Sequence, residues 1–244
     1  MSLLFVLMII VQVALIIHVV KTGRNQIWIW VLALLSLPGA IAYIAVEILP
    51  ELLRSRTAQR TARGLRKAMD PGRDLRRYES EARVTSNVAS RQRYAQELVR
   101  HQRYDEAIGQ YREALTGLYE HDPNLMLGLA QAQFGKGDAS AARATLDELI
   151  QRHPDFRSPA GHLLYARALE AEGNLPKALE EYAVLAPSYP GAEAAVRYAQ
   201  LLQAQGRRAE AQKLARELLE QARIAPGHYR RAQRPWLDAA QRLL

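Results

Sequence analysis

The chain has 244 residues, 49% of them hydrophobic, and carries a formal net charge of +8 at pH 7. It contains no cysteine, which excludes a disulfide framework and a thiolate metal site. Residues 50–87 hold ten basic and five acidic side chains, so most of the excess positive charge lies in one short segment. A nucleic-acid-binding domain usually carries a basic stripe on its folded surface, so this distribution argues against nucleic acid as a partner.

Two apolar stretches at the amino terminus predict membrane-spanning helices. Leu3–Val20 has 18 residues. As a helix it would reach about 27 Å, close to the thickness of a hydrocarbon core. The second stretch, Ile27–Leu49, begins with tryptophans at positions 28 and 30, which favour a membrane–water boundary. We expect Pro38–Gly39, near its middle, to kink or break this helix. We therefore predict a two-span membrane hairpin over residues 1–50.

Two alternatives to the hairpin are weaker. A cleaved signal peptide would need a basic start and a small-residue cleavage pattern, and the first stretch has neither. A buried soluble hairpin would need a partner core for two helices that are apolar on every face.

The second stretch resembles the amino-terminal membrane segment of phospholipase D-type proteins such as cardiolipin synthases. The resemblance covers about the first 50 residues and rests on the interfacial tryptophans, Pro38–Gly39 and the following Tyr43. It implies a membrane anchor but not the catalytic activity of those proteins. The catalytic signature of that superfamily begins His-x-Lys, and no histidine of this chain is followed by x-Lys.

A basic juxtamembrane linker and a capping helix are expected over residues 51–87. Basic residues beside a membrane span are attracted to the anionic cytoplasmic leaflet by about 1 kcal/mol per charge, and they orient the span by the positive-inside rule. We therefore predict contact with membrane lipids and a cytoplasmic repeat domain; a solvated linker helix is the alternative. In the two-span topology Lys21 and Arg24 would lie on the far side, against the same rule. The predicted membrane-surface residues are Arg54, Arg56, Arg60, Arg63, Arg66 and Lys67.

Residues 88–222 repeat a helix–turn–helix pattern four times. The turn glycines Gly137, Gly173 and Gly206 are separated by 36 and 33 residues, and Gln102 takes the place of glycine in the first unit. Each first helix carries a large–small pair, and each second helix carries a small residue that permits close packing. The pairs are Tyr94–Ala95, Leu129–Ala130, Tyr165–Ala166 and Tyr198–Ala199, and the small residues are Ala107, Ala142, Ala178 and Ala211.

This pattern resembles the tetratricopeptide repeat (TPR). The resemblance implies an α-solenoid of about four TPR-like helix pairs over residues 88–244. We expect a cap helix at each end: Arg73–Arg83 with Leu75, Tyr78 and Ala82 on one face, and His228–Leu244 with a bend at Pro235. The complete prediction is an all-α fold, a two-helix transmembrane hairpin followed by this solenoid.

The resemblance also implies that the first helices form a concave surface that binds a protein or peptide partner. We expect a ladder of hydrogen-bonding side chains for an extended or helical peptide; a polar wall that faces water is the alternative. The carboxylate clamp of the family needs lysine and asparagine at these levels, which this sequence does not supply. The predicted partner-binding residues are Gln96, Gln131, Arg167 and Gln200, with Gln92, Phe134 and Gln203 beside them.

The sequence predicts no catalytic residue, no metal site and no cofactor. Its histidines have no metal-ligand spacing on a helix, and it contains no nucleotide-binding loop and no hydrolase motif. We therefore predict a membrane-anchored scaffold, not an enzyme, at the cytoplasmic face of a bacterial inner membrane. The alternatives are an accessory subunit of a phospholipid-synthesising or phospholipid-handling enzyme and a periplasm-facing TPR factor that assists secretion.

Overall fold

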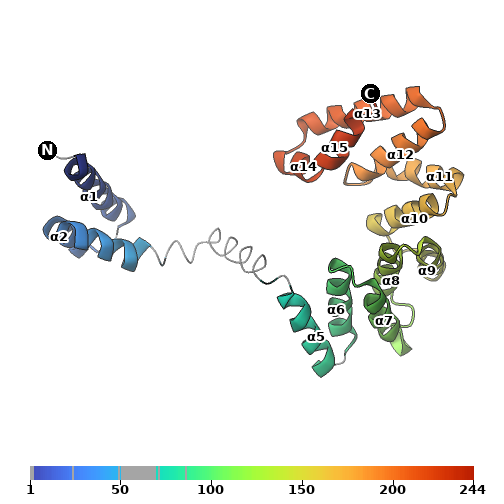
Figure 1. The fold of residues 1–244 in the computed structure, drawn as a ribbon, viewed down its shortest axis with the longest axis horizontal. Helices are drawn as coiled ribbons and strands as arrows, with labels where there is room; N and C mark the ends of the chain where they lie inside the picture. The colour runs from blue at the N-terminus through green and yellow to red at the C-terminus, as the bar shows by residue number, and fades with distance from the viewer. Residues whose placement is uncertain (1–2, 24, 49, 51–69, 71, 86) are drawn as a thin grey trace. The chain divides into compact units, whose positions relative to one another are not determined.

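The computed structural model describes residues 3–23, 25–48, 50, 70, 72–85 and 87–244. The described residues form helices and no strand (Figure 1), in agreement with the all-α prediction. The chain divides into two compact units, Met1–Arg73 and Asp74–Leu244. The six basic residues predicted at a membrane surface, from Arg54 to Lys67, lie outside the described residues.

The first unit pairs helix α1 (Leu3–Thr22) with helix α2 (Ile27–Tyr43), which continues into a π-helical turn, η1 (Ile44–Ile48). Polar side chains form hydrogen bonds that join α1 to α2 and the start of α2 to η1. Gln12 Nε2 donates to the Leu32 carbonyl, and Trp28 Nε1 donates to Glu47 Oε1 at 3.1 Å. His18 Nδ1 lies 2.9 Å from the hydroxyl oxygen of Tyr43, which is fully buried.

Helix α2 bends sharply near Pro38, where the sequence predicts a kink. A Cβ atom built on Gly39 would lie 2.5 Å from the carbonyl oxygen of Val31. In a straight α-helix, residues eight positions apart are separated by about 12 Å along the axis. Pro38 lacks the N–H of a normal helical bond, and its ring pushes the preceding turn aside. Helix α2 therefore turns back toward its own first half.

Within the described part of the chain, no helix has both the length and the apolar character needed to cross a bilayer. The prediction of two membrane-spanning helices is therefore not supported. Both apolar stretches do form helices, but α2 ends as an α-helix after 17 residues and is bent at Gly39.

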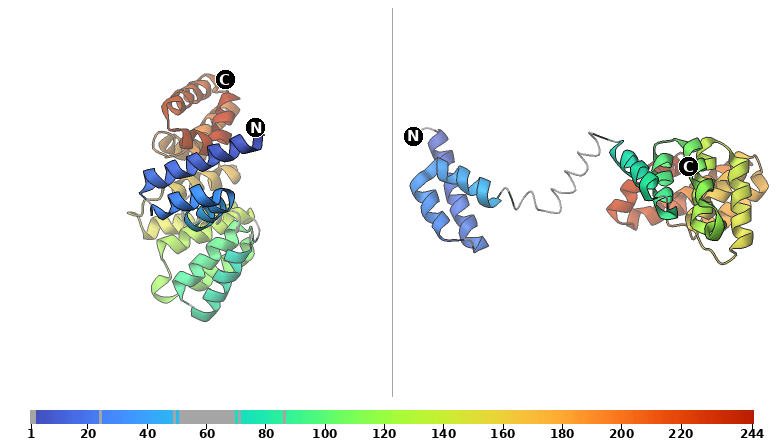
Figure 2. Two further views of the ribbon diagram at one scale, coloured as in Figure 1. Left: turned by 90° about the vertical axis from the view of Figure 1, so that its left-hand side faces the viewer. Right: turned by 90° about the horizontal axis from the view of Figure 1, so that it is seen from below.

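The second unit stacks four helix pairs in chain order (Figures 1 and 2). Each first helix packs on its own second helix, and each second helix packs on the next first helix. The pairs are α6 (Val88–Arg100) with α7 (Tyr104–Ala114), α8 (Pro123–Lys136) with α9 (Ala139–Arg152), α10 (Pro159–Ala171) with α11 (Leu175–Leu185), and α12 (Glu193–Ala204) with α13 (Arg208–Ile224). A short 3-10 turn, η2 (Gly117–Tyr119), follows α7.

The small residue of each second helix is fully buried. The four alanines, Ala107, Ala142, Ala178 and Ala211, are each 0% exposed. A methyl side chain lets the two helices of a pair approach closely, whereas a larger one would separate them. The predicted register of the repeats is confirmed at these positions.

The four turns share one backbone geometry. Gly137, Gly173 and Gly206 have φ angles of 95°, 80° and 80°, and Gln102 adopts a φ of 58° at the equivalent position. In each turn the N–H of the next residue donates to the carbonyl of a residue near the end of the first helix, at 2.9 or 3.0 Å, and so satisfies a free carbonyl there. These bonds join Arg103 to Leu98, Asp138 to Gln133, Asn174 to Leu169 and Arg207 to Leu202.

Both predicted caps are present. Helix α5 (Arg73–Thr85) packs Leu75 and Ala82 against the first pair. At the other end two helices, α14 (Gly227–Ala232) and α15 (Arg234–Gln241), replace the single bent helix of the prediction. The break precedes Pro235 because proline fits the first turn of a helix, where its missing N–H is not needed. Helix α15 packs on α12 and α13.

Candidate partner-binding groove

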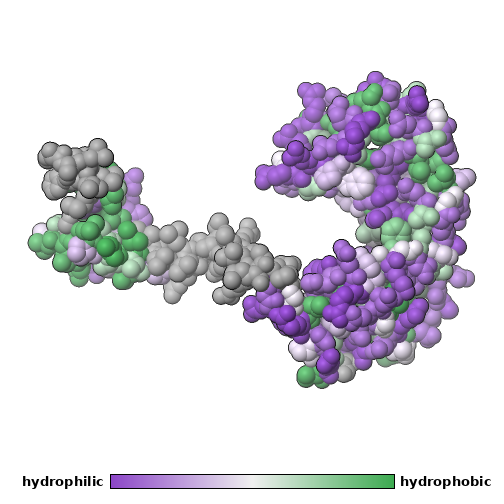
Figure 3. All heavy atoms as spheres, in the orientation of Figure 1, coloured by the Kyte–Doolittle hydropathy of each residue, from purple (hydrophilic) through white to green (hydrophobic). Residues whose placement is uncertain are grey.

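Two cavities lie along the first helices of the second unit, which curves around a hollow in the space-filling view (Figure 3). The first cavity has a volume of about 420 Å³ and is lined by Gln92, Gln96 and Gln131. The second has a volume of about 390 Å³ and is lined by Gln131, Phe134 and Arg167. Because Gln131 lines both, the cavities adjoin, and together they are called the groove below.

The structure brings together five of the seven predicted partner-binding residues and leaves two apart. Gln200 and Gln203 are exposed on α12 and line neither of these cavities. Only the start of α12, at Glu193, reaches the second cavity. The predicted ladder therefore does not continue along α12 as a groove.

The first cavity has a polar rim and a tightly packed floor. Gln96 and Gln131 are exposed, and Asp122 and Asn124 add further polar groups to the lining. Tyr111, which is 1% exposed, closes the floor. Burial raises the pKa of its hydroxyl to about 12, because the charged phenolate would be poorly solvated there.

The second cavity holds a guanidinium group over an aromatic ring. The Arg167 Cζ atom lies 4.8 Å from the ring centroid of Phe134, which is a cation–π contact. Its Nε atom is buried and has no hydrogen-bond partner among the described residues. The carboxylate of Glu193 lies nearby, with Oε1 3.6 Å from Nε, too far for a hydrogen bond.

A network of charged side chains continues from Arg167 toward the carboxyl-terminal cap. Glu193 Oε1 accepts from Arg197 Nε at 2.9 Å, and Arg197 Nη1 donates to Glu170 Oε2 at 3.2 Å. Arg197 also lies 5.2 Å from the ring centroid of Trp236 on α15. The Tyr182 hydroxyl donates to Glu170 at 2.6 Å. Its burial and this bond raise the pKa of the hydroxyl. These contacts hold Glu193 in place where it lines the groove.

Sequence reasoning missed several lining residues that follow the same helical stripe. The predicted residues occupy the fifth, ninth or twelfth position of each repeat unit, counted from residues 88, 123, 159 and 192. Extending the stripe by three residues toward the amino terminus gives the second position, which holds Asn124, Ala160 and Glu193, and all three line the groove. Tyr189 also lines it, but it comes from the loop before α12, where no periodic pattern points to it.

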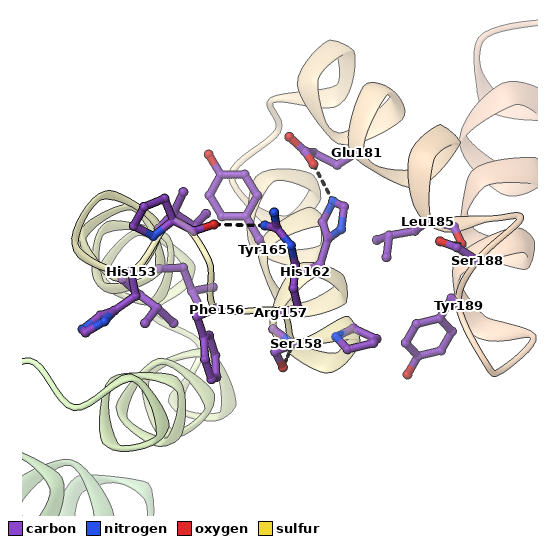
Figure 4. A pocket seen from close by; sticks show the side chains of 16 residues that line it. His153, Phe156, Arg157, Ser158, His162, Tyr165, Glu181, Leu185, Ser188 and Tyr189 are labelled. Atoms are coloured by element: carbon purple, nitrogen blue, oxygen red, sulfur yellow. Dashed lines mark hydrogen bonds and ion pairs between the residues drawn. The ribbon is translucent and has the colours of Figure 1, made fainter.

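A third cavity, of about 430 Å³, lies between α9, α10 and α11 (Figure 4). Its lining includes Leu149, Phe156 and Leu185, with Tyr189 shared between it and the groove. His162 Nε2 lies 2.6 Å from Glu181 Oε2, so these two polar groups satisfy each other.

The comparisons with known proteins agree with this architecture. Residues 98–160 match the family model of the tetratricopeptide repeat. The matched residues lie within the second unit, from the end of α6 to the start of α10. The fold of the chain is similar to that of a thermophilic TPR protein from Thermus thermophilus in a crystal structure. The TM-score is 0.50 and the sequence identity 18%, and the match covers 69% of this chain and 86% of that chain.

No curated protein matches the sequence. Neither the family match nor the structural likeness supports the resemblance of the amino-terminal stretch to phospholipase D-type proteins. The family match over residues 98–160 and the fold of the second unit are typical of protein-interaction scaffolds, which are commonly non-catalytic.

Proposed function

We propose that the second unit binds an extended segment of a partner protein in the groove. The proposal rests chiefly on Gln131, which joins a cavity lined by amides to a cavity that holds Arg167 over Phe134. The joined cavities give one binding surface with two different chemical characters.

The lining indicates the kind of segment. The side-chain amides of Gln92, Gln96 and Gln131 each carry donors and acceptors, which suit the N–H and C=O groups of an extended backbone. In the second cavity Arg167 presents its terminal nitrogens, whereas its Nε faces Glu193. A carboxylate of the partner would therefore bind the Nη atoms, with an apolar side chain beside it against Phe134. The proposed segment has an acidic residue next to an apolar one.

Removal of the Arg167 side chain tests this proposal. Affinity capture with crosslinking from detergent-solubilised membranes would first identify the partner, and Kd would then be measured with the purified partner. Arg167→Ala should weaken binding about tenfold or more, the effect of removing a hot-spot arginine, and leave helicity unchanged. Arg112→Ala is the matched control, because Arg112 is exposed on the second helix α7 and lines none of the three cavities. Full binding by both Arg167→Ala and a Gln96→Ala/Gln131→Ala variant would contradict the proposal.

We also propose that the first unit associates with a membrane, at the cytoplasmic face of a bacterial inner membrane. The supporting observation is an inside-out distribution of polarity. Large apolar side chains point outward, with Trp30 70% exposed and Leu34 80% exposed, whereas Gln12, His18 and Trp28 bond inside the unit. Hydrocarbon favours this arrangement, because polar groups there must be satisfied within the protein.

Fractionation and reporter fusions test the location. The full-length protein should resist carbonate extraction from membranes, and a fragment of residues 70–244 should not sediment with them. Release of the full-length protein by carbonate would contradict membrane association. A reporter that is active only in the cytoplasm should work when it is fused after Leu244; activity of a periplasmic reporter there would instead favour the secretion function.

A further inference from the structure

The bend in α2 determines where a membrane-bound first unit can place its connector. The connector is defined as residues 23–26, between α1 and α2. A Cβ on Gly39 would lie 2.5 Å from the Val31 carbonyl oxygen, so the second half of α2 returns toward the first half. A helix that enters hydrocarbon and turns back in this way leaves on the side where it entered.

The aromatic side chains at the start of α2 fit a position at the membrane surface. Trp30 is 70% exposed, and Trp28 binds Glu47, which follows the bend. Tryptophan favours the interface and glutamate avoids the hydrocarbon core. The Trp28–Glu47 bond thus brings the beginning of α2 and the residues after its bend to the same depth.

The distribution of positive charge supports the same arrangement. Two straight spans would put Lys21 and Arg24 on the opposite face from the basic linker at positions 54–67, against the positive-inside rule. A helix that returns puts all of these charges on one face, where anionic lipids attract them. The returning helix removes the conflict that the two-span prediction contained.

We propose that α2 is a re-entrant helix that dips into the lipid bilayer, so that the connector and the TPR domain lie on the same side of the membrane. This proposal rests on the proposed membrane association of the first unit. It differs from the two-span topology in one observable, the side on which the connector is exposed.

Single thiols can locate both segments, because the chain has no cysteine. Gln26→Cys marks the connector and leaves the bond from Ile27 N to Asn25 Oδ1 in place. Ser140→Cys marks an exposed site of the TPR domain. Each full-length variant is treated with a membrane-impermeant maleimide in intact spheroplasts and in inverted inner-membrane vesicles. Both thiols should react in the inverted vesicles, and neither should react in the spheroplasts.

Three other results would overturn the proposal. Reaction of the thiol at position 26 in spheroplasts, with that at position 140 reacting in inverted vesicles, would show that α2 crosses. Reaction at position 26 only after detergent would place the connector inside the bilayer. Recovery of the protein in the carbonate supernatant would show that membrane association itself is absent, a failure that fractionation distinguishes from a wrong topology.

A second comparison tests whether the bend sets this topology. Combined Pro38→Leu and Gly39→Leu substitutions restore a helical N–H and place a side chain where the bent form has no room for one. The two thiols should then react from opposite sides of the membrane. Ala33→Leu, at an exposed site on α2, is the control and should leave both thiols on one side. Same-side labelling in the Pro38→Leu/Gly39→Leu protein would contradict the role of the bend.

Discussion

Gly109 and Gly128 both lie within helices, but their surroundings differ. A Cβ at Gly128 would lie 2.5 Å from ring atoms of the buried Tyr111, whereas a Cβ at Gly109 would meet no atom within 4 Å. Gly128→Ala should therefore lower the free energy of unfolding by about 1–3 kcal/mol through overpacking. Gly109→Ala should raise it by up to about 1 kcal/mol, because alanine favours the helix. Urea unfolding measures both changes, and effects of the same sign would contradict this packing.

The buried Tyr111 hydroxyl makes the stability of the TPR domain fall at high pH. Burial raises its pKa to about 12 from an ordinary value of 10.0, so the folded state favours the neutral phenol. Its contribution is complete below pH 10.0 and is lost as the pH rises toward about 12. Tyr111→Phe should therefore lose less stability than the unsubstituted protein over this range. Thermal unfolding at a series of pH values measures the difference, with Tyr119→Phe, at an exposed site, as control. Equal losses in all three proteins would contradict a buried phenol.

At the scale of a helix pair, the alanine of the second helix sets the separation of the two helices. Ala178 is 0% exposed on α11, and Ala183 is exposed on the same helix. Ala178→Trp should lower the free energy of unfolding by about 1–3 kcal/mol or more, because the contact has no room for an indole. Ala183→Trp should leave it nearly unchanged. A midpoint of thermal unfolding that is the same in both variants would show that the repeat register is misplaced.

The helices and turns of the repeats were predictable from the sequence because the same sequence features recur in every repeat. A buried alanine, a turn residue with positive φ and the same capping bond recur in all four pairs. Even Gln102 was placed correctly, since the period of the repeat identifies the turn without a glycine. The bend of α2 was predicted at Pro38, but its size was not, because it depends on the contact between Gly39 and Val31.

The groove was predicted only in part. A helical stripe identifies the residues of one face, and it placed Gln131, Phe134 and Arg167 correctly in the lining. The side chains that face them depend on how neighbouring helices stack. Tyr189 comes from a loop, and Glu193 approaches Arg167 across two helices. Gln200 was included because the pattern repeats, although only the start of α12, at Glu193, lines the groove.

The two units of the molecule have different proposed partners. Large apolar side chains of α1 and α2 are exposed, which suits lipid, and the groove of the second unit combines amides with one arginine, which suits a protein segment. The molecule as a whole would then hold a partner protein beside a membrane. The membrane association and the groove can be tested separately, since each depends on residues of one unit.

Site-specific photo-crosslinking in living cells tests the central claim, that the groove binds the partner. A photoreactive amino acid at position 131 samples both cavities at once, because Gln131 is exposed and lines each of them. The same amino acid at position 112 samples the exposed face of α7 and is the control. We predict one strong adduct to a partner protein from position 131, lost on Arg167→Ala, and none from position 112. Adducts from position 112 with none from position 131 would contradict the account.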